Sequence, residues 1–264
     1  MQRRLHSGWQ TCALSAWLLV VLSVSACTSG RAVRGAETPA WAEQQSQPTI
    51  VVLGSSTAQG GGASAPELAW VNRLQVYANR FDPPVRIVNL ARGGYTTYHV
   101  LPSGMKAAED RPAPDSLRNV TRALVGRPDV IIINLPSNDA AFGYGLAEQI
   151  GNMDRVIEEA ERAGSRVWIT TSQPRNLDEP GRRALTQFRD WAATAHRRQA
   201  VDVWTELALP DGRIQPGFDS GDGIHLNDEG HRIIFERVRA AGVVEAAIDG
   251  WKSRLSRELT LESQ

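Results

Sequence analysis

Short apolar runs alternate with amphipathic stretches along most of the chain. The apolar runs are Thr49–Leu53, Val85–Leu90, Asp129–Leu135, Arg166–Thr171 and Ala200–Trp204. Each is rich in Val, Ile or Leu and has the length of a β-strand. Three are almost continuously apolar, as in strands that are buried on both faces of a parallel sheet.

The stretches between these runs have helical spacing. They are Pro66–Asn79, Asp115–Val125, Leu146–Ala163, Pro180–His196 and Asn227–Ala241. Regular strand–helix alternation predicts an α/β domain from about residue 49 to 245: a doubly wound, flavodoxin-like sheet of five parallel strands flanked by helices. Residues 246–264 carry mixed charges without strong periodicity and are predicted to form a C-terminal tail, with one helix possible around Trp251.

The first 48 residues differ in character from the rest. Arg3 and Arg4 precede Thr11–Ala26, a run of 16 residues without charge. Because a membrane-spanning helix needs roughly 20 apolar residues, a secretory signal peptide over 1–26 is favoured over a permanent anchor. Residues 27–48 are polar and contain Gly and Pro, as expected of a flexible tether.

The end of the signal resembles a bacterial lipobox, because small residues directly precede Cys27. This resemblance implies cleavage before Cys27 and lipid attachment to its thiol, with an ordinary signal peptide as the alternative. Thr28 follows instead of Asp, which by the rule for such lipoproteins favours the outer membrane. We therefore expect an exported protein, lipid-anchored and facing the periplasm.

Cysteine content and charge limit the remaining possibilities. The other cysteine, Cys12, lies in the predicted signal, so the exported domain has no internal disulfide. Loss of residues 1–26 removes two arginines and no acid, which changes the net charge from 0 to −2. Nothing here indicates a nucleic-acid partner, and we expect a monomer without a cofactor.

Residues that can do chemistry follow the predicted strands, where ligands of such sheets bind. Gly54-Ser55-Ser56-Thr57 follows the first strand, and the glycine allows a sharp turn that presents a hydroxyl. Gly93-Gly94 follows the second strand, where a backbone amide can donate to an anion. Taken alone, the serine fragment is more typical of an ordinary turn than of a catalytic one, while the glycine turn is compatible with both interpretations.

Two further fragments complete the set. Asn138 lies just beyond the third strand and offers a carboxamide donor. Near the carboxyl end, Asp222 precedes His225 by three residues, so its carboxylate can accept from one imidazole nitrogen while the other takes a proton from a serine.

These four blocks, in this order, resemble those of the SGNH or GDSL hydrolase superfamily, and the resemblance extends from Thr49 to about Ala241. It implies a serine esterase with Ser56 as nucleophile, His225 as base and Asp222 as its partner. It also implies an oxyanion hole formed by Ser56, Gly94 and Asn138. The family's Asp after the first glycine is Ser55 here, and its glycine two residues before the asparagine is Pro136, so the serine register and the oxyanion geometry need a structural test.

Two other kinds of site are disfavoured by the sequence. An α/β-hydrolase is disfavoured because the chain has no G-x-S-x-G elbow. A metal site of Asp222, His225 and His231 lacks further ligands nearby, while His99 and His196 show no acidic partner at a suggestive spacing and are interpreted as structural or exposed.

The substrate class is less constrained than the chemistry. Five polar residues near the strand ends favour a carbohydrate O-acetyl ester: Arg92, Tyr95, Tyr98, Gln173 and Arg175. A lysophospholipase or thioesterase acting on envelope lipids, an acyltransferase and a catalytically silent glycan-binding lipoprotein are the alternatives.

Overall fold

The computed structural model describes residues 47–262. The predicted signal peptide, the predicted lipid-attachment residue Cys27 and all of the predicted tether except its last two residues lie outside this range. Within residues 47–262, no helix combines the length and apolar character needed to cross a membrane.

Five parallel strands form one sheet in the order β2-β1-β3-β4-β5, which confirms the predicted fold class. The strands are β1 Thr49–Gly54, β2 Arg86–Asn89, β3 Val130–Asn134, β4 Arg166–Thr170 and β5 Ala200–Val201. β1 and β3 lie at the centre of the sheet, in a register that pairs Gly54 with Asn134. All residues of both strands are buried, as the continuous apolar runs predict.

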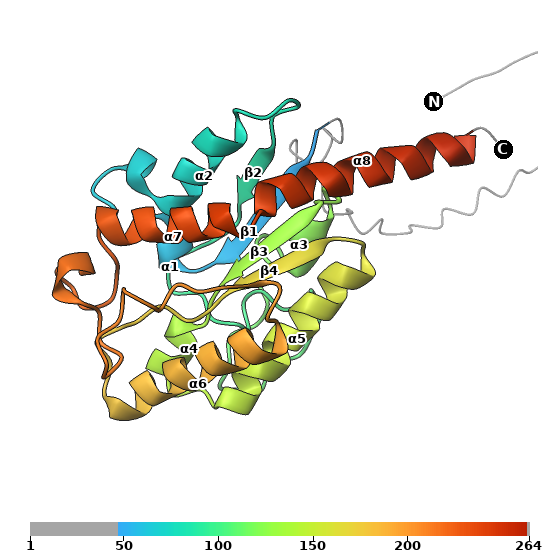
Figure 1. Cartoon of the computed structure of the whole chain (residues 1–264). Coiled ribbons are helices and arrows are strands. Elements are labelled where there is room, and N and C mark those ends of the chain that lie inside the picture. The colour runs from blue at the N-terminus through green and yellow to red at the C-terminus, as the bar shows by residue number, and fades with distance from the viewer. Residues whose placement is uncertain (1–46, 263–264) are drawn as a thin grey trace, which may run out of the picture. The chain divides into compact units, whose positions relative to one another are not determined.

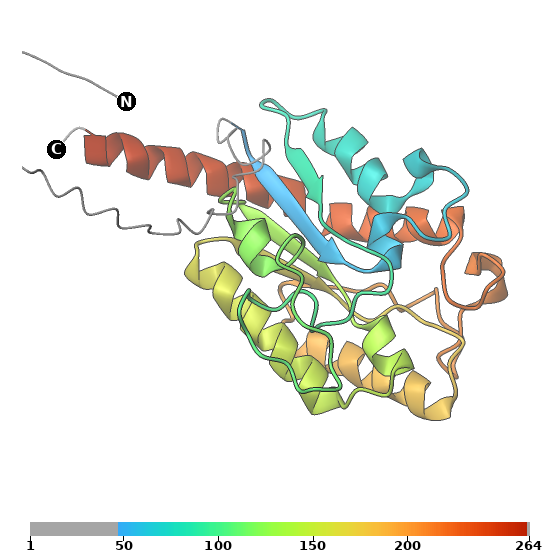
Figure 2. The ribbon, with the colours of Figure 1, turned by 180° about the vertical axis from the view of Figure 1, so that it is seen from behind.

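Helices cover both faces of the sheet (Figures 1 and 2). One face carries α2 Trp70–Ala78, α7 Asp228–Ala240 and α8 Val243–Glu262; the other carries α3 Val120–Leu124, α5 Leu146–Arg162 and α6 Glu179–Ala195. Side chains of β1 alternate between two cores, Ile50 and Val52 on the first face and Val51 and Leu53 on the second. Short elements complete the chain: α1 Ser56–Gln59, α4 Ser137–Ala141, and 3₁₀ turns at Pro66–Leu68 and Pro216–Phe218.

α3 and β5 are much shorter than predicted, because a side-chain cap starts α3 late and a side-chain turn ends β5 early. α3 begins only at Val120, where the Asn119 carboxamide caps it by accepting from the N–H of Arg122 at 3.0 Å. β5 ends at Val201, because Asp202 Oδ1 accepts from the N–H groups of Trp204 and Thr205 and closes a turn.

The predicted C-terminal tail is wrong for most of its length, since α8 continues without interruption to Glu262. Its start is buried through Val243, Val244, Ala246 and Ala247, so the domain does not end at residue 245. The helix contacts β1, β3 and β4.

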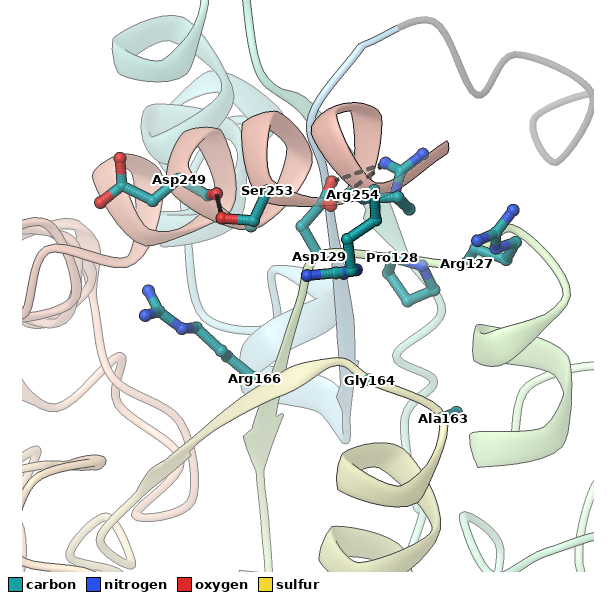
Figure 3. A pocket seen from close by; sticks show the side chains of 11 residues that line it. Arg127, Pro128, Asp129, Ala163, Gly164, Arg166, Asp249, Ser253 and Arg254 are labelled. Carbon is teal, nitrogen blue, oxygen red and sulfur yellow. Dashed lines mark hydrogen bonds and ion pairs between the residues drawn. The ribbon is translucent and has the colours of Figure 1, made fainter. Parts of the chain in front are cut away.

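A buried ion pair fixes α8 beside the amino ends of the strands (Figure 3). Arg254 Nη2 lies 3.1 Å from Asp129 Oδ1, and Asp129 Oδ2 accepts from the Thr49 N–H at 2.9 Å. Burial raises the pKa of Asp129, although the contacts with Thr49 and Arg254 oppose it. A pocket of about 300 Å³ adjoins this pair, at the sheet edge opposite the predicted catalytic residues.

Candidate active site

Ser56 lies on a sharp turn at the carboxyl end of β1. Gly54 ends the strand, Ser55 is extended, and α1 starts at Ser56. A Cβ on Gly54 would lie 2.7 Å from Ala58 Cβ and 3.1 Å from the Asn134 carbonyl oxygen, so only glycine permits this close approach. The turn buries Ser55 and leaves Ser56 partly exposed at the sheet edge.

The structure brings Ser56, His225 and Asp222 into one hydrogen-bonded series. Ser56 Oγ lies 2.8 Å from His225 Nε2, and His225 Nδ1 lies 2.6 Å from Asp222 Oδ2. Because a carboxylate accepts, Nδ1 carries the proton and Nε2 faces the serine as an acceptor. Of the two adjacent serines, Ser56 and not Ser55 therefore places its hydroxyl against the imidazole.

Asp222 is held as a carboxylate by its own loop. Its Oδ1 accepts from the backbone N–H groups of Ile224 and His225, each at 2.8 Å. Partial burial raises the pKa of Asp222, but the hydrogen bonds from the His225 backbone and ring and from Ile224 outweigh it, and the pKa lies well below its usual range. The Asp222 side chain is therefore a carboxylate at neutral pH, where it accepts from the His225 ring.

Gly61 and Gly62, which follow α1, pack against His225 and form what we call the glycine wall. A Cβ on Gly61 would lie 3.1 Å from His225 Cδ2, and one on Gly62 would lie 2.7 Å from His225 Cβ and 2.2 Å from the Leu226 carbonyl oxygen. Gly62 also has a φ of +92°. These residues look like an ordinary flexible loop in the sequence, yet they define where the imidazole rests.

His231 holds the glycine wall in place through a hydrogen bond to Gly61. The side chain is fully buried in the first turn of α7. Its Nδ1 accepts from the Trp70 N–H at 3.3 Å, so Nε2 carries the proton and donates to the Gly61 carbonyl at 3.0 Å. Burial lowers the pKa of His231, which keeps the ring neutral. With both ring nitrogens engaged, His231 is a structural support rather than a ligand beside Asp222 and His225.

Two backbone amides beside Ser56 are available as donors. Within residues 47–262, the N–H groups of Ser56 and Gly94 have no intramolecular acceptor. The neighbouring Gly93 N–H is occupied by Gln59 Oε1 at 2.7 Å, and a Cβ on Gly93 would lie 3.8 Å from Ser56 Cβ. This turn after β2 therefore lies against the serine with the Gly94 amide unused.

Asn138 is buried at the start of α4 with a defined orientation. Its Nδ2 donates to the Tyr95 carbonyl at 2.9 Å, and its Oδ1 accepts from Arg175 Nη1 at 2.9 Å. A carboxamide nitrogen has two N–H groups, so one remains for a ligand. The carbonyl of Pro136 accepts from the backbone N–H of Asp139 at 2.9 Å, so Pro136 caps the turn that carries Asn138.

Asp139 ties the loop after β3 to the loop after β2. Its carboxylate accepts from the Thr97 N–H at 3.0 Å and from the Thr97 hydroxyl at 2.6 Å. Burial raises the pKa of Asp139 to about 7, against the opposing effect of the Thr97 hydrogen bonds. Asp139 directly follows Asn138 in the sequence, but its neighbours there give no indication that it joins the two loops.

Most of the polar residues that predicted a sugar substrate make hydrogen bonds to other residues of the protein. The Tyr95 hydroxyl bonds to Asp115, and the Tyr98 hydroxyl bonds to Glu148. Gln173 Nε2 donates to the Ile224 carbonyl at 3.1 Å and so supports the Asp222–His225 loop.

The two other histidines within residues 47–262, His99 and His196, lie apart from the series. His99 stacks on Tyr95 with ring centroids 4.5 Å apart. His196 Nε2 lies 3.9 Å from Asp154 Oδ1, a partner on α5 that the sequence spacing does not reveal.

Residues 52–233 match the model of the GDSL-like lipase/acylhydrolase family. A search of curated protein sequences gave no significant match.

Several solved structures have a similar fold. A GDSL-like lipase from Bacteroides thetaiotaomicron has a TM-score of 0.55 at 17% identity, covering 77% of this chain and 90% of its own. The psychrotrophic esterase EstA from a Pseudoalteromonas species has a TM-score of 0.54 at 17% identity, with 74% and 96% covered. An acetyl xylan esterase has a TM-score of 0.56 at 16% identity, with 73% and 98% covered.

Proposed function

Because the chain belongs to the GDSL-like lipase/acylhydrolase family and is a serine ester hydrolase, we propose that it cleaves esters through Ser56, His225 and Asp222. The observation that carries this assignment is the series of contacts at 2.8 Å and 2.6 Å that joins hydroxyl, imidazole and carboxylate. A general base within hydrogen-bond reach activates a serine that is otherwise a weak nucleophile.

In the proposed mechanism, His225 Nε2 takes the hydroxyl proton while Ser56 Oγ attacks the ester carbonyl carbon. The amides of Ser56 and Gly94 and the remaining N–H of Asn138 stabilise the resulting oxyanion. His225 then protonates the departing alcohol, and an acyl group stays on Ser56. Water, activated by the same imidazole, releases the acid and restores the hydroxyl. Asp222 stabilises the imidazolium formed in each half-reaction.

Fluorophosphonate labelling tests this assignment without knowledge of the substrate. We expect one label on the full chain, at Ser56, and a labelling rate at least about 100-fold lower in His225→Ala because the general base is lost. His196→Ala is the matched control, since that ring lies beside Asp154, and it should label at the wild-type rate. Labelling of Ser56 at an unchanged rate in His225→Ala would contradict the proposal.

For the substrate, we propose a short-chain ester, specifically an O-acetyl group on a carbohydrate. The support for this is the polar surface beside Ser56, where Arg92 is exposed at the start of the Gly93–Gly94 turn. Such surroundings suit a hydroxylated alcohol moiety better than an apolar one.

Acyl-chain profiling tests the substrate proposal. With p-nitrophenyl esters whose acyl chains have two to sixteen carbons, we expect kcat/KM to be highest for acetate and at least about tenfold lower from eight carbons onward. The reason is that a polar site gives a long acyl chain no apolar surface against which to bury itself. Acetate release from an acetylated oligosaccharide, measured without added acceptor, is the second arm. A maximum at eight or more carbons would instead support a lipid acylhydrolase.

A further inference from the structure

We propose that Arg175 is a positioning residue for the oxyanion hole: its guanidinium fixes the Asn138 carboxamide in the orientation that aims an N–H at the developing negative charge. This inference rests on the proposed function. Arg175 lies in the loop after β4, outside the four sequence blocks that suggest the chemistry.

The Asn138 amide makes two hydrogen bonds, one through its oxygen and one through its nitrogen. Oδ1 accepts from Arg175 Nη1 at 2.9 Å, while Nδ2 donates to the Tyr95 carbonyl at 2.9 Å. Flipping the amide would place its NH₂ group against the guanidinium and its oxygen against a carbonyl, which replaces two attractions with two repulsions. The contacts therefore select a single orientation, and the direction of the free N–H follows from it.

Charge adds to this geometric effect. An arginine side chain remains protonated in proteins, so the half-buried guanidinium of Arg175 keeps its positive charge. This charge permanently polarises the carboxamide oxygen of Asn138. Withdrawing electron density from Oδ1 makes the amide N–H a stronger donor, as hydrogen bonds in series strengthen one another. Within residues 47–262, no other side chain donates to Asn138 Oδ1.

Arg175 is itself held in place by the turn that it supports. Nη1 also reaches the Ser137 carbonyl at 3.5 Å, and the guanidinium is half-buried. Burial lowers the pKa of Arg175, while the nearby negative charge of Asp222 opposes this. Arg175 thus contacts the proposed oxyanion donor Asn138 and is also within electrostatic range of the Asp222 carboxylate.

The test is a double-mutant cycle on the full chain with a short p-nitrophenyl ester. Because a donor that acts on the oxyanion contributes only in the transition state, Arg175→Met should lower kcat about tenfold and leave KM unchanged. Asn138→Ala should lower kcat by about 10² to 10³-fold. If Arg175 acts through Asn138, adding Arg175→Met to Asn138→Ala should cause no further loss.

Arg182→Met is the matched control. Arg182 donates to the Leu177 and Asp211 carbonyls and so holds the far end of the same loop without contacting Asn138. Its kcat should stay within about threefold of wild type. Thermal unfolding of each variant shows whether it is folded, and the neutral Arg175→Gln replaces Arg175→Met if the latter is not.

The outcomes separate this inference from the proposed function. An equal loss of kcat from the Arg175 variant in both backgrounds, or a raised KM with unchanged kcat, would overturn the positioning role while leaving the triad intact. An unaltered kcat in Arg175→Met would do the same. Undiminished turnover in Asn138→Ala would instead remove the oxyanion assignment on which the inference depends.

Discussion

Ser56→Ala is expected to lower kcat by about 10⁴-fold or more, because it removes the atom that forms the acyl intermediate. The hydroxyl makes its contact with His225 Nε2 at 2.8 Å, so the change removes the acceptor of the substrate's acyl group but no packing. Steady-state hydrolysis of p-nitrophenyl acetate by the purified chain measures the effect, with thermal unfolding to show that the fold is retained.

Ser55→Ala provides the matched control because it deletes an adjacent hydroxyl in the same turn. Ser55 is 4% exposed, caps α1 without a side-chain hydrogen bond and has no contact with His225. Its kcat should remain within about threefold of wild type, since the buried hydroxyl does not touch the reacting atoms. The reverse order of effects, with Ser55→Ala the slower enzyme, would place the nucleophile one residue earlier.

The sequence predicted the sheet well because its central strands are buried on both faces. Continuous runs of Val and Ile specify such strands directly, and parallel strands place their carboxyl ends at one edge. This geometry is why the loops carrying Ser56, Gly94 and Asn138 could be assigned to one site from their positions after successive strands. The Asp222–His225 pair follows from local spacing alone.

The supports of the site could not be predicted, because they join segments far apart in the chain. His231 contacts Gly61 across 170 positions, and Arg175 contacts Asn138 across 37. Neither residue lies in a periodic pattern that reveals its partner, and a glycine run looks the same whether it is flexible or packed against an imidazole. The length of α8 was missed for a related reason: its packing depends on Gly250, which would be an unfavourable residue in an isolated helix.

Gly62→Ala is expected to be the most damaging substitution outside the reacting groups. The added Cβ would lie 2.2 Å from the Leu226 carbonyl oxygen and 2.7 Å from His225 Cβ, at a residue with a φ of +92°. Because a backbone atom blocks the space, either the glycine wall or the His225 loop must move. We expect a loss of at least about 3 kcal/mol in the free energy of unfolding. A displaced imidazole should also lower kcat about 100-fold or more.

Gly104→Ala separates these two causes. Gly104 has a φ of +84°, but a Cβ there would meet no atom within 4 Å, so this variant carries the backbone strain without the collision. It should lose about 1 to 2 kcal/mol of unfolding free energy and retain wild-type kcat. Chemical denaturation and p-nitrophenyl acetate hydrolysis measure both quantities in each variant. Equal losses in the two variants would mean that strain alone accounts for the effect and that the glycine wall does not position His225.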